Sequence, residues 1–126
     1  MFSHVMLGVN DIQAAKEFYD AILGTIGYKP GIVDPKGRCV YASDTGVFLL
    51  TNPINGEPAT HGNGSTMGFA VTSPEMADAW HEAGLAAGGS ACEDPPGVRE
   101  GGPMRLYLAY LRDPSGNKIC ALYRMP

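Results

Sequence analysis

The feature that most constrains this chain is an internal repeat, because the second half follows the pattern of the first with an offset of 62 residues. Three matches carry the repeat: Leu7-Gly8-Val9 with Phe69-Ala70-Val71, Phe18 with Trp80, and Gly27 with Gly89. A duplication of this length predicts two copies of one supersecondary unit inside a single domain. We place module 1 at about residues 1–52, a connection at 53–64 and module 2 at about 65–126.

Module 1 has the pattern of a strand, a helix and three further strands. Apolar and polar side chains alternate over Ser3–Val9, as in a half-buried strand. Asn10-Asp11 then supplies an N-cap for a helix whose apolar residues recur at helical spacing as far as Gly24. Three short strands are predicted next, separated by turn residues, at Lys29–Asp34, Arg38–Ala42 and Val47–Thr51.

Module 2 repeats this order. We expect a strand at Ser65–Val71, a helix from Ser73-Pro74 to Gly88-Gly89, a long loop at Pro95–Pro103 and a tight turn at Asp113–Gly116. The remaining predicted strands are Ser90–Glu93, Met104–Leu111 and Asn117–Tyr123. Each half would form a small antiparallel sheet with one apolar face. The prediction is an α+β fold in which the two sheets bury each other's apolar faces and leave a ligand cleft between them.

Composition and charge exclude several classes of protein. The net charge is −4, the pI is about 5.2 and no Lys/Arg cluster is present, which disfavours nucleic acid as a partner. No apolar run is long enough for a membrane span, and the N-terminus lacks the pattern of a secretory signal. An odd set of cysteines, Cys39, Cys92 and Cys120, predicts reduced thiols. We therefore expect a cytoplasmic protein that binds neither nucleic acid nor membrane.

Several short motifs, in order, identify a family resemblance. They are His4-Val5 through Asn10-Asp11, Glu17-Phe18-Tyr19, Leu23-Gly24 through Gly27-Tyr28, and Asp113 through Ile119. With these motifs the chain resembles the vicinal oxygen chelate superfamily, which includes glyoxalase I, bleomycin-resistance proteins, fosfomycin-resistance enzymes and extradiol dioxygenases. The resemblance covers nearly the whole chain. It implies a glyoxalase-like fold of two βαβββ modules whose curved sheets surround a cleft.

The resemblance also implies where a metal would bind. In metal-using members, the first and last strands of each module supply one ligand apiece, drawn from His, Glu and Gln. The matching positions here are His4, Leu49, Thr66 and Cys120, and only His4 keeps a usual ligand type. We therefore expect no metal and no other cofactor. The less favoured alternative is a rebuilt divalent-metal site, in which His61 joins His4 and Cys120 as a set compatible with zinc.

The candidate cleft residues follow from strand alternation, the repeat and hairpin pairing. Alternation puts His4 and Met6 on one face, and the repeat puts Thr66 in the position of His4. Pairing the final hairpin across Asp113–Gly116 places Ala109 opposite Cys120 and turns Arg105 and Tyr107 to the same side. The predicted ligand-binding residues are His4, Met6, Leu49, Thr66, Arg105, Tyr107 and Cys120.

Some of these residues have alternative roles. Arg105 or Arg99 could hold a carboxylate or phosphate oxygen. His4 and Cys120 are the catalytic candidates, as an acid/base group and a nucleophile, although a hydrogen-bonded strand histidine and a buried structural thiol are the favoured interpretations.

Three classes of function remain open. The leading hypothesis is a homodimer that binds a small organic molecule in its cleft without the family metal. The first alternative is a lyase, isomerase or dioxygenase of the glyoxalase type with a rebuilt or metal-free site. The second is a degenerate module used only for protein association. The sequence does not identify the ligand.

Overall fold

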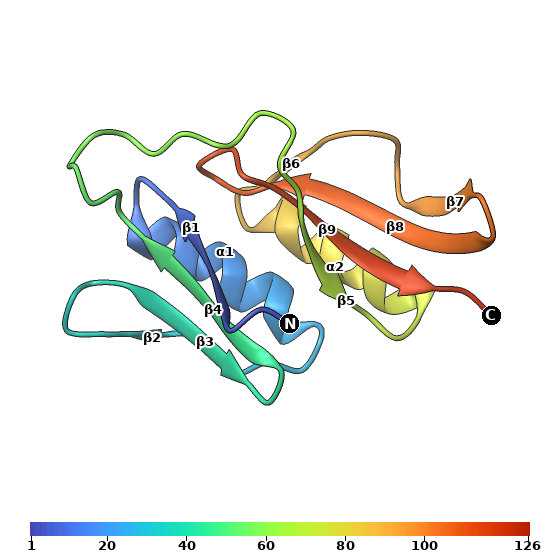
Figure 1. The fold of residues 1–126 in the computed structure, drawn as a ribbon, viewed down its shortest axis with the longest axis horizontal. Helices are drawn as coiled ribbons and strands as arrows, with labels where there is room; N and C mark the ends of the chain where they lie inside the picture. Colours follow the sequence, from blue (N-terminus) through green and yellow to red (C-terminus); the bar gives the residue numbers. More distant parts are fainter.

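Two sheets lie next to each other with one helix behind each, as Figure 1 shows for this computed structural model of residues 1–126. The first sheet, sheet A, has the order β1-β4-β3-β2, and the second, sheet B, has the order β5-β9-β8-β6 with β7 also paired to β8. In chain order, the elements are β1 (His4–Gly8), α1 (Ile12–Gly24), β2 (Ile32–Val33), β3 (Cys39–Ser43), β4 (Gly46–Thr51), β5 (Met67–Ala70), α2 (Pro74–Ala86), β6 (Ser90–Ala91), β7 (Gly97–Gly101), β8 (Met104–Arg112) and β9 (Lys118–Arg124).

The predicted repeat and the α+β class are confirmed by this order of elements. Both helices have 13 residues, and each bound of α2 lies 62 positions after that of α1 (74 − 12 and 86 − 24). β1 pairs with β4 so that Met6 is opposite Leu49, and β5 pairs with β9 so that Gly68 is opposite Cys120. Leu49 and Cys120 are thus equivalent positions of the two modules.

The sheets are mixed, where the sequence suggested purely antiparallel ones. β1 runs parallel to β4, and β5 runs parallel to β9. In each module the chain leaves the first strand through the helix and returns to it with the last strand, which enters in the same direction. A crossover of this kind brings parallel strands together.

A second difference lies in the segment predicted as a long loop, Pro95–Pro103. It contains β7, which pairs antiparallel with the first half of β8 through a turn at Gly101-Gly102-Pro103. Gly102 has a φ of 60°, which glycine adopts without a steric cost. The glycines and prolines that suggested a loop instead lie at the ends of a short strand or next to it.

Both predicted helix starts are confirmed by their caps. The side chain of Asp11 accepts a hydrogen bond of 3.1 Å from the backbone N–H of Ala14, and Ser73 accepts one of 3.1 Å from Met76. Each bond satisfies a backbone donor that the first helical turn leaves free. The helices can therefore begin directly behind β1 and β5, which fixes their position over the sheets.

The two modules share one core, which is built around a chain of aromatic rings. Ring centroids are 5.0 Å apart for Tyr19 and Phe48, 5.5 Å for Phe48 and Phe69, and 6.4 Å for Phe69 and Trp80. Phe48 comes from sheet A and Phe69 from sheet B, so this pair joins the modules. Each helix covers the apolar face of its own sheet, and the helices contact each other. The two modules therefore bury each other's apolar surface through the helices and these rings. The opposite face of each sheet carries no helix, and we call it the open face.

Candidate functional site

The edge strands β1 and β5 face each other along a gap between the two sheets, which we call the seam (His4–Gly8 against Met67–Ala70) (Figure 1). Two cavities lie along it. The small cavity has a volume of about 270 Å³ and the large cavity about 570 Å³. Both are lined by Phe2, Val5, Met67 and Gly68, so they adjoin. A molecule in the seam can therefore contact both modules at once.

The small cavity is apolar and aromatic. Its walls include Tyr28 after α1, Tyr41 and Phe48 from sheet A, and Phe69 from sheet B. Side chains such as Ser43 bring hydroxyl groups, and no charged side chain lines it. Apolar walls with a few polar groups are typical of sites for small organic molecules.

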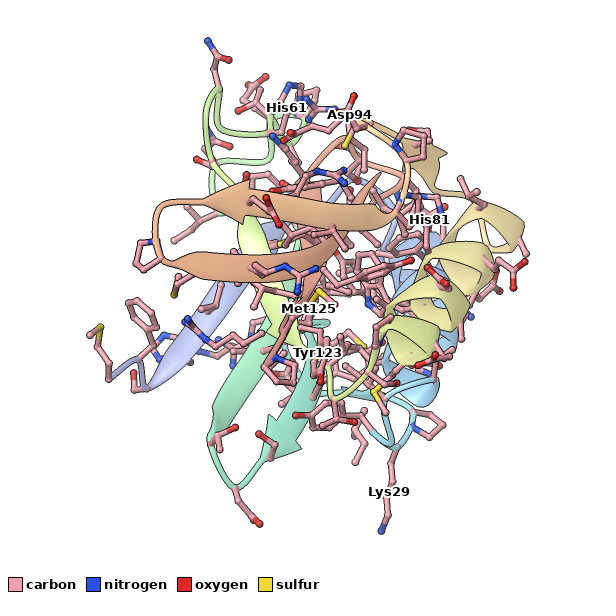
Figure 2. The ribbon with its side chains drawn as sticks, turned by 90° about the vertical axis from the view of Figure 1, so that its right-hand side faces the viewer. Lys29, His61, His81, Asp94, Tyr123 and Met125 are labelled. Carbon is pink, nitrogen blue, oxygen red and sulfur yellow. The ribbon has the colours of Figure 1, made fainter.

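The large cavity is more polar. It is lined by residues of the connection between the modules, including His61, and by Ser65, Thr66 and the start of β9. Lys118 is the only Lys, Arg, Asp or Glu in its wall. An ion pair with Glu93 raises the pKa of Lys118, which therefore stays protonated at neutral pH. In Figure 2, His61 lies at the opposite end of the molecule from Lys29.

Three of the predicted site residues come together at the seam. His4 lines the small cavity, with its Nδ1 atom 2.8 Å from the hydroxyl oxygen of Ser3, while Met6 and Thr66 line the large cavity. The strand alternation and the repeat thus placed these side chains along one gap. Their role in binding stays a prediction.

Leu49 and Cys120 line neither cavity, although both lie on open faces. Cys120 is 5% exposed, and burial raises the pKa of its thiol to about 11, although the positive charge of Lys118 acts to lower it. The thiol is therefore protonated at neutral pH. A nucleophilic role would need a thiolate, so the geometry favours a structural role for Cys120.

The predicted register of the last hairpin is wrong by one residue. Tyr110 pairs with Cys120, while Ala109 pairs with Ala121. The cause is the turn, in which the N–H of Asp113 donates to the carbonyl of Asn117 (2.9 Å) and the N–H of Gly116 donates to that of Asp113 (2.9 Å). Gly116 has a φ of 93°. This is a three-residue hairpin loop with a glycine bulge, whose extra residue shifts every pair by one.

The shift moves Arg105 and Tyr107 away from the face of Cys120. The Tyr107 hydroxyl donates a hydrogen bond of 2.7 Å to Asp78 on α2, and Arg105 pairs with Glu100 at 3.1 Å. Tyr110 takes the place predicted for Tyr107, with the Lys118 ammonium 5.1 Å from its ring centroid. The sequence signal for Tyr110 was Gly116, which marks the three-residue loop.

The four family positions do not fit a metal ion. Leu49 has no donor atom, the Thr66 hydroxyl is a weak neutral ligand, and the Cys120 thiol is buried away from both cavities. The alternative set is not brought together, because His4 lines the small cavity, His61 lines the large one and Cys120 lines neither. No three His, Cys, Asp or Glu side chains are grouped to hold an ion.

Neither helix of the chain is long and apolar enough to cross a membrane.

Two βαβββ modules joined through a shared core, with a seam between their first strands, define a glyoxalase-like protein. The chain belongs to the Glyoxalase/Bleomycin resistance protein/Dioxygenase superfamily, whose family model matches residues 1–121. No curated protein sequence matches the chain.

Solved structures agree with this assignment. A glyoxalase/bleomycin resistance protein from Albidiferax ferrireducens T118 is 63% identical, with a TM-score of 0.95 over 98% of this chain and 99% of that chain. A glyoxalase-related enzyme from Fulvimarina pelagi is 19% identical, with a TM-score of 0.74 over 98% of this chain and 87% of that one. A family enzyme from Burkholderia phytofirmans PsJN is 18% identical, with a TM-score of 0.73 over 98% of both chains. The last two show a common fold.

Proposed function

We propose that the protein binds a small organic molecule in the seam between β1 and β5 and does so without the family metal. The observation that carries this proposal is the pair of adjoining cavities along the seam, of about 270 and 570 Å³. The large cavity alone is in the size range of small-molecule sites, and the small cavity extends it. The unsuitable donors at Leu49, Thr66 and Cys120 favour binding over metal-dependent chemistry.

The two cavities of the seam offer a ligand different kinds of contact. The aromatic rings of the small cavity offer apolar contact, while Thr66 and Ser65 in the large cavity offer hydroxyl groups. A few polar groups among apolar walls orient a ligand, because each must find a partner when water leaves. Met6 lies at the large cavity and adapts easily to the shape of a guest, since its side chain is flexible.

A homodimer is part of the same proposal. The open face of sheet A carries no Lys, Arg, Asp or Glu, and one of its residues, Ile32, is 73% exposed. The open face of sheet B has an apolar centre that includes Leu108 and Leu122, which are opposite each other on β8 and β9. Two copies related by a two-fold axis can cover sheet A of each with sheet B of the other. We therefore take a second copy of this chain as the occupant of the open faces.

The binding proposal can be tested with a seam-blocking variant. A library of neutral and charged aromatic fragments would be screened by ligand-observed NMR against the wild type, Thr66→Phe and Thr72→Phe. Thr66 lines the large cavity, whereas Thr72 is exposed beyond the end of β5 and lines neither cavity. We expect fragments that bind the wild type and Thr72→Phe but fail to bind Thr66→Phe. Absence of any bound fragment, or binding that survives Thr66→Phe unchanged, would contradict the proposal.

A further inference from the structure

We infer that the ligand of the seam is an organic anion with an apolar body, whose carboxylate or phosphate group lies at the Lys118 end of the large cavity. This inference rests on the proposed function and narrows it to one class of ligand. It is carried by the charges around the two cavities, by hydroxyl groups without partners and by the division of the seam into a polar and an apolar part.

The first observation is the absence of carboxylates from the cavity walls. The chain has 13 acidic and 9 basic residues, yet no Asp or Glu lines either cavity. The charged residue that does line them is Lys118, accompanied by the imidazoles of His4 and His61. In an acidic protein, a site without acidic side chains selects against cations and favours anions, because the nearest charges set the local potential.

The second observation is a cluster of basic groups around the Asp113–Asn117 turn. Arg112 and Lys118 are opposite each other where β8 and β9 meet, and an Arg112 guanidinium N–H donates a 2.8 Å hydrogen bond to the carbonyl of Gly116. The ring of His61 packs on Gly116, where a Cβ atom would stand 3.0 Å from its Nδ1 atom. The turn therefore gathers three basic groups from β8, β9 and the connection, two of them in the cavity wall.

The acidic groups near this cluster are accounted for. Glu93 forms an ion pair with Lys118 from outside the cavity wall. Asp113 is 3% exposed and accepts hydrogen bonds from Tyr19 and Asn117, so its charge is turned into the core. An incoming anion therefore competes with Glu93 alone for the Lys118 ammonium.

Hydroxyl groups line the same cavity as Lys118. Thr60, Ser65 and Thr66 line the large cavity, and their hydroxyls make no hydrogen bond within the protein. Each can donate one to an anionic oxygen, and hydrogen bonds to charged acceptors are the strong ones. A carboxylate or phosphate offers several acceptor oxygens and can use more than one of these donors.

The open face of sheet B also carries positive charge. Arg99, Arg112 and Arg124 donate only to uncharged acceptors, whereas Arg38 and Arg105 pair with carboxylates. The three arginines without a carboxylate partner all lie on the open face of sheet B, on the strands β7, β8 and β9. Of the three, Arg112 is opposite Lys118 at the end of the large cavity, and its positive charge there would attract an anion towards the seam.

The apolar body has its own place. The small cavity adjoins the large one at Met67 and Gly68 and is walled by rings such as Tyr28 and Phe69. An anion held at Lys118 can therefore extend its apolar part along β5 into the small cavity. A fully polar anion, such as inorganic phosphate, would leave this cavity unused.

The experiment compares matched ligands by isothermal titration calorimetry at low salt. The probes are 4-phenylbutyrate, 4-phenylbutyl phosphate and the uncharged 4-phenylbutyramide, with inorganic phosphate as the anion that lacks an apolar body. We expect the carboxylate, the phosphate ester or both to bind the wild type about tenfold more tightly than the amide and than inorganic phosphate. A tenfold gain in affinity is what one charge-assisted hydrogen bond contributes. The two organic anions distinguish carboxylate from phosphate recognition.

Three variants locate the anionic group. Lys118→Gln should weaken binding of the organic anion about tenfold and leave the amide unchanged, whereas Glu93→Gln should tighten it by releasing Lys118. Lys36→Gln is the matched control, because Lys36 is exposed, lies outside both cavities and forms no ion pair. Equal affinity for anion and amide, or equal effects of the two lysine variants, would overturn the inference and leave the proposed function standing. No binding of any organic probe, anionic or neutral, would overturn both.

Discussion

The hydroxyl of Tyr19 donates a hydrogen bond of 2.7 Å to Oδ2 of Asp113, although the two residues are 94 positions apart in the chain. Tyr19 belongs to α1 of module 1 and Asp113 to the β8–β9 turn of module 2. The same carboxylate accepts a 2.9 Å bond from the side-chain amide of Asn117, which also donates 2.9 Å to the carbonyl of Gly8 on β1. These buried bonds tie the turn beside the large cavity to α1 and β1 of module 1. Asp113 and Asn117 therefore join the two modules at this end of the seam.

Removing the Tyr19 hydroxyl should destabilise the fold. Tyr19→Phe keeps the ring in the core and takes one donor from a buried carboxylate, which is expected to cost about 1.5–3 kcal/mol. Urea denaturation measures the change in the free energy of unfolding. Tyr123→Phe is the control, because the Tyr123 hydroxyl makes no hydrogen bond, and it should change this free energy by less than about 0.5 kcal/mol. Equal losses in the two variants would show that the bond to Asp113 contributes nothing.

Stability should fall at alkaline pH. Burial and the neighbouring Asp113 charge raise the pKa of Tyr19 well above its usual value, and burial raises the pKa of Cys120 from 9.0 to about 11. Both groups keep their protons longer in the folded state, so their contribution is complete below the unfolded pKa and is lost as pH rises towards the folded pKa. For Cys120 this window is about pH 9 to 11.

Chemical denaturation at several pH values checks this expectation. The free energy of unfolding of the wild type should decline above about pH 9, and Cys120→Ala should make the decline shallower between pH 9 and 11, by at most about 1.4 kcal/mol per pH unit. The slope is compared, because the substitution also changes the stability at neutral pH. A wild type whose stability stays flat up to pH 11 would contradict the prediction.

The three thiols should differ in reactivity. Cys39 and Cys120 are buried, whereas Cys92 is partly exposed, and burial raises the pKa of all three. With a chromogenic disulfide reagent at pH 8, we expect Cys92 to react first. Cys39 and Cys120 should react only when the protein unfolds. Mass spectrometry of the labelled peptides identifies the site. Rapid labelling of Cys120 in the folded protein would show that its cover opens readily.

The sequence predicted the framework of the molecule well, because that framework follows local rules. The caps at Asp11 and Ser73 and the alternation that puts His4 and Met6 on one face depend on neighbouring residues only. The face of sheet B on which Tyr107 lies depends instead on the length of the loop between β8 and β9. One extra residue in that loop, the bulge at Gly116, shifts the register by one and moves Tyr107 to the face opposite to that of Cys120. Pairings between distant residues, such as Tyr19 with Asp113, leave no periodic signal in the sequence. The positions and lining residues of the two cavities could not be predicted for the same reason.

The proposed dimer predicts an effect of charge on the open face of sheet A. Leu49 lies on this face, between Met6 and Val40 of the neighbouring strands. Leu49→Lys should therefore convert a dimer into a 13.3 kDa monomer in light scattering at micromolar concentration. Leu85→Lys is the control, because Leu85 is an exposed leucine on α2, and it should leave the mass of the dimer unchanged. A monomeric wild type would contradict the proposal directly.

Gly68 should be coupled energetically to Cys120. Gly68 lines both cavities, and a Cβ atom at this position would stand 3.1 Å from the Cys120 sulfur. Gly68→Ala should therefore destabilise the protein by about 1 kcal/mol through crowding, which is the lower end of the cost of overpacking. In the background of Cys120→Ala the sulfur is absent, so the same substitution should cost less.

A double-mutant cycle measures this coupling. We expect the Gly68→Ala and Cys120→Ala double variant to be about 0.5–1 kcal/mol more stable than the sum of the single effects predicts. Gly101→Ala, on β7, is the matched substitution in a strand, because a Cβ atom there meets nothing within 4 Å and the cycle with Cys120→Ala should be additive. Additive behaviour at Gly68 as well would mean that the two residues do not touch. The added methyl group also narrows the seam where the two cavities adjoin, so Gly68→Ala should weaken any ligand that spans both, even in the Cys120→Ala background.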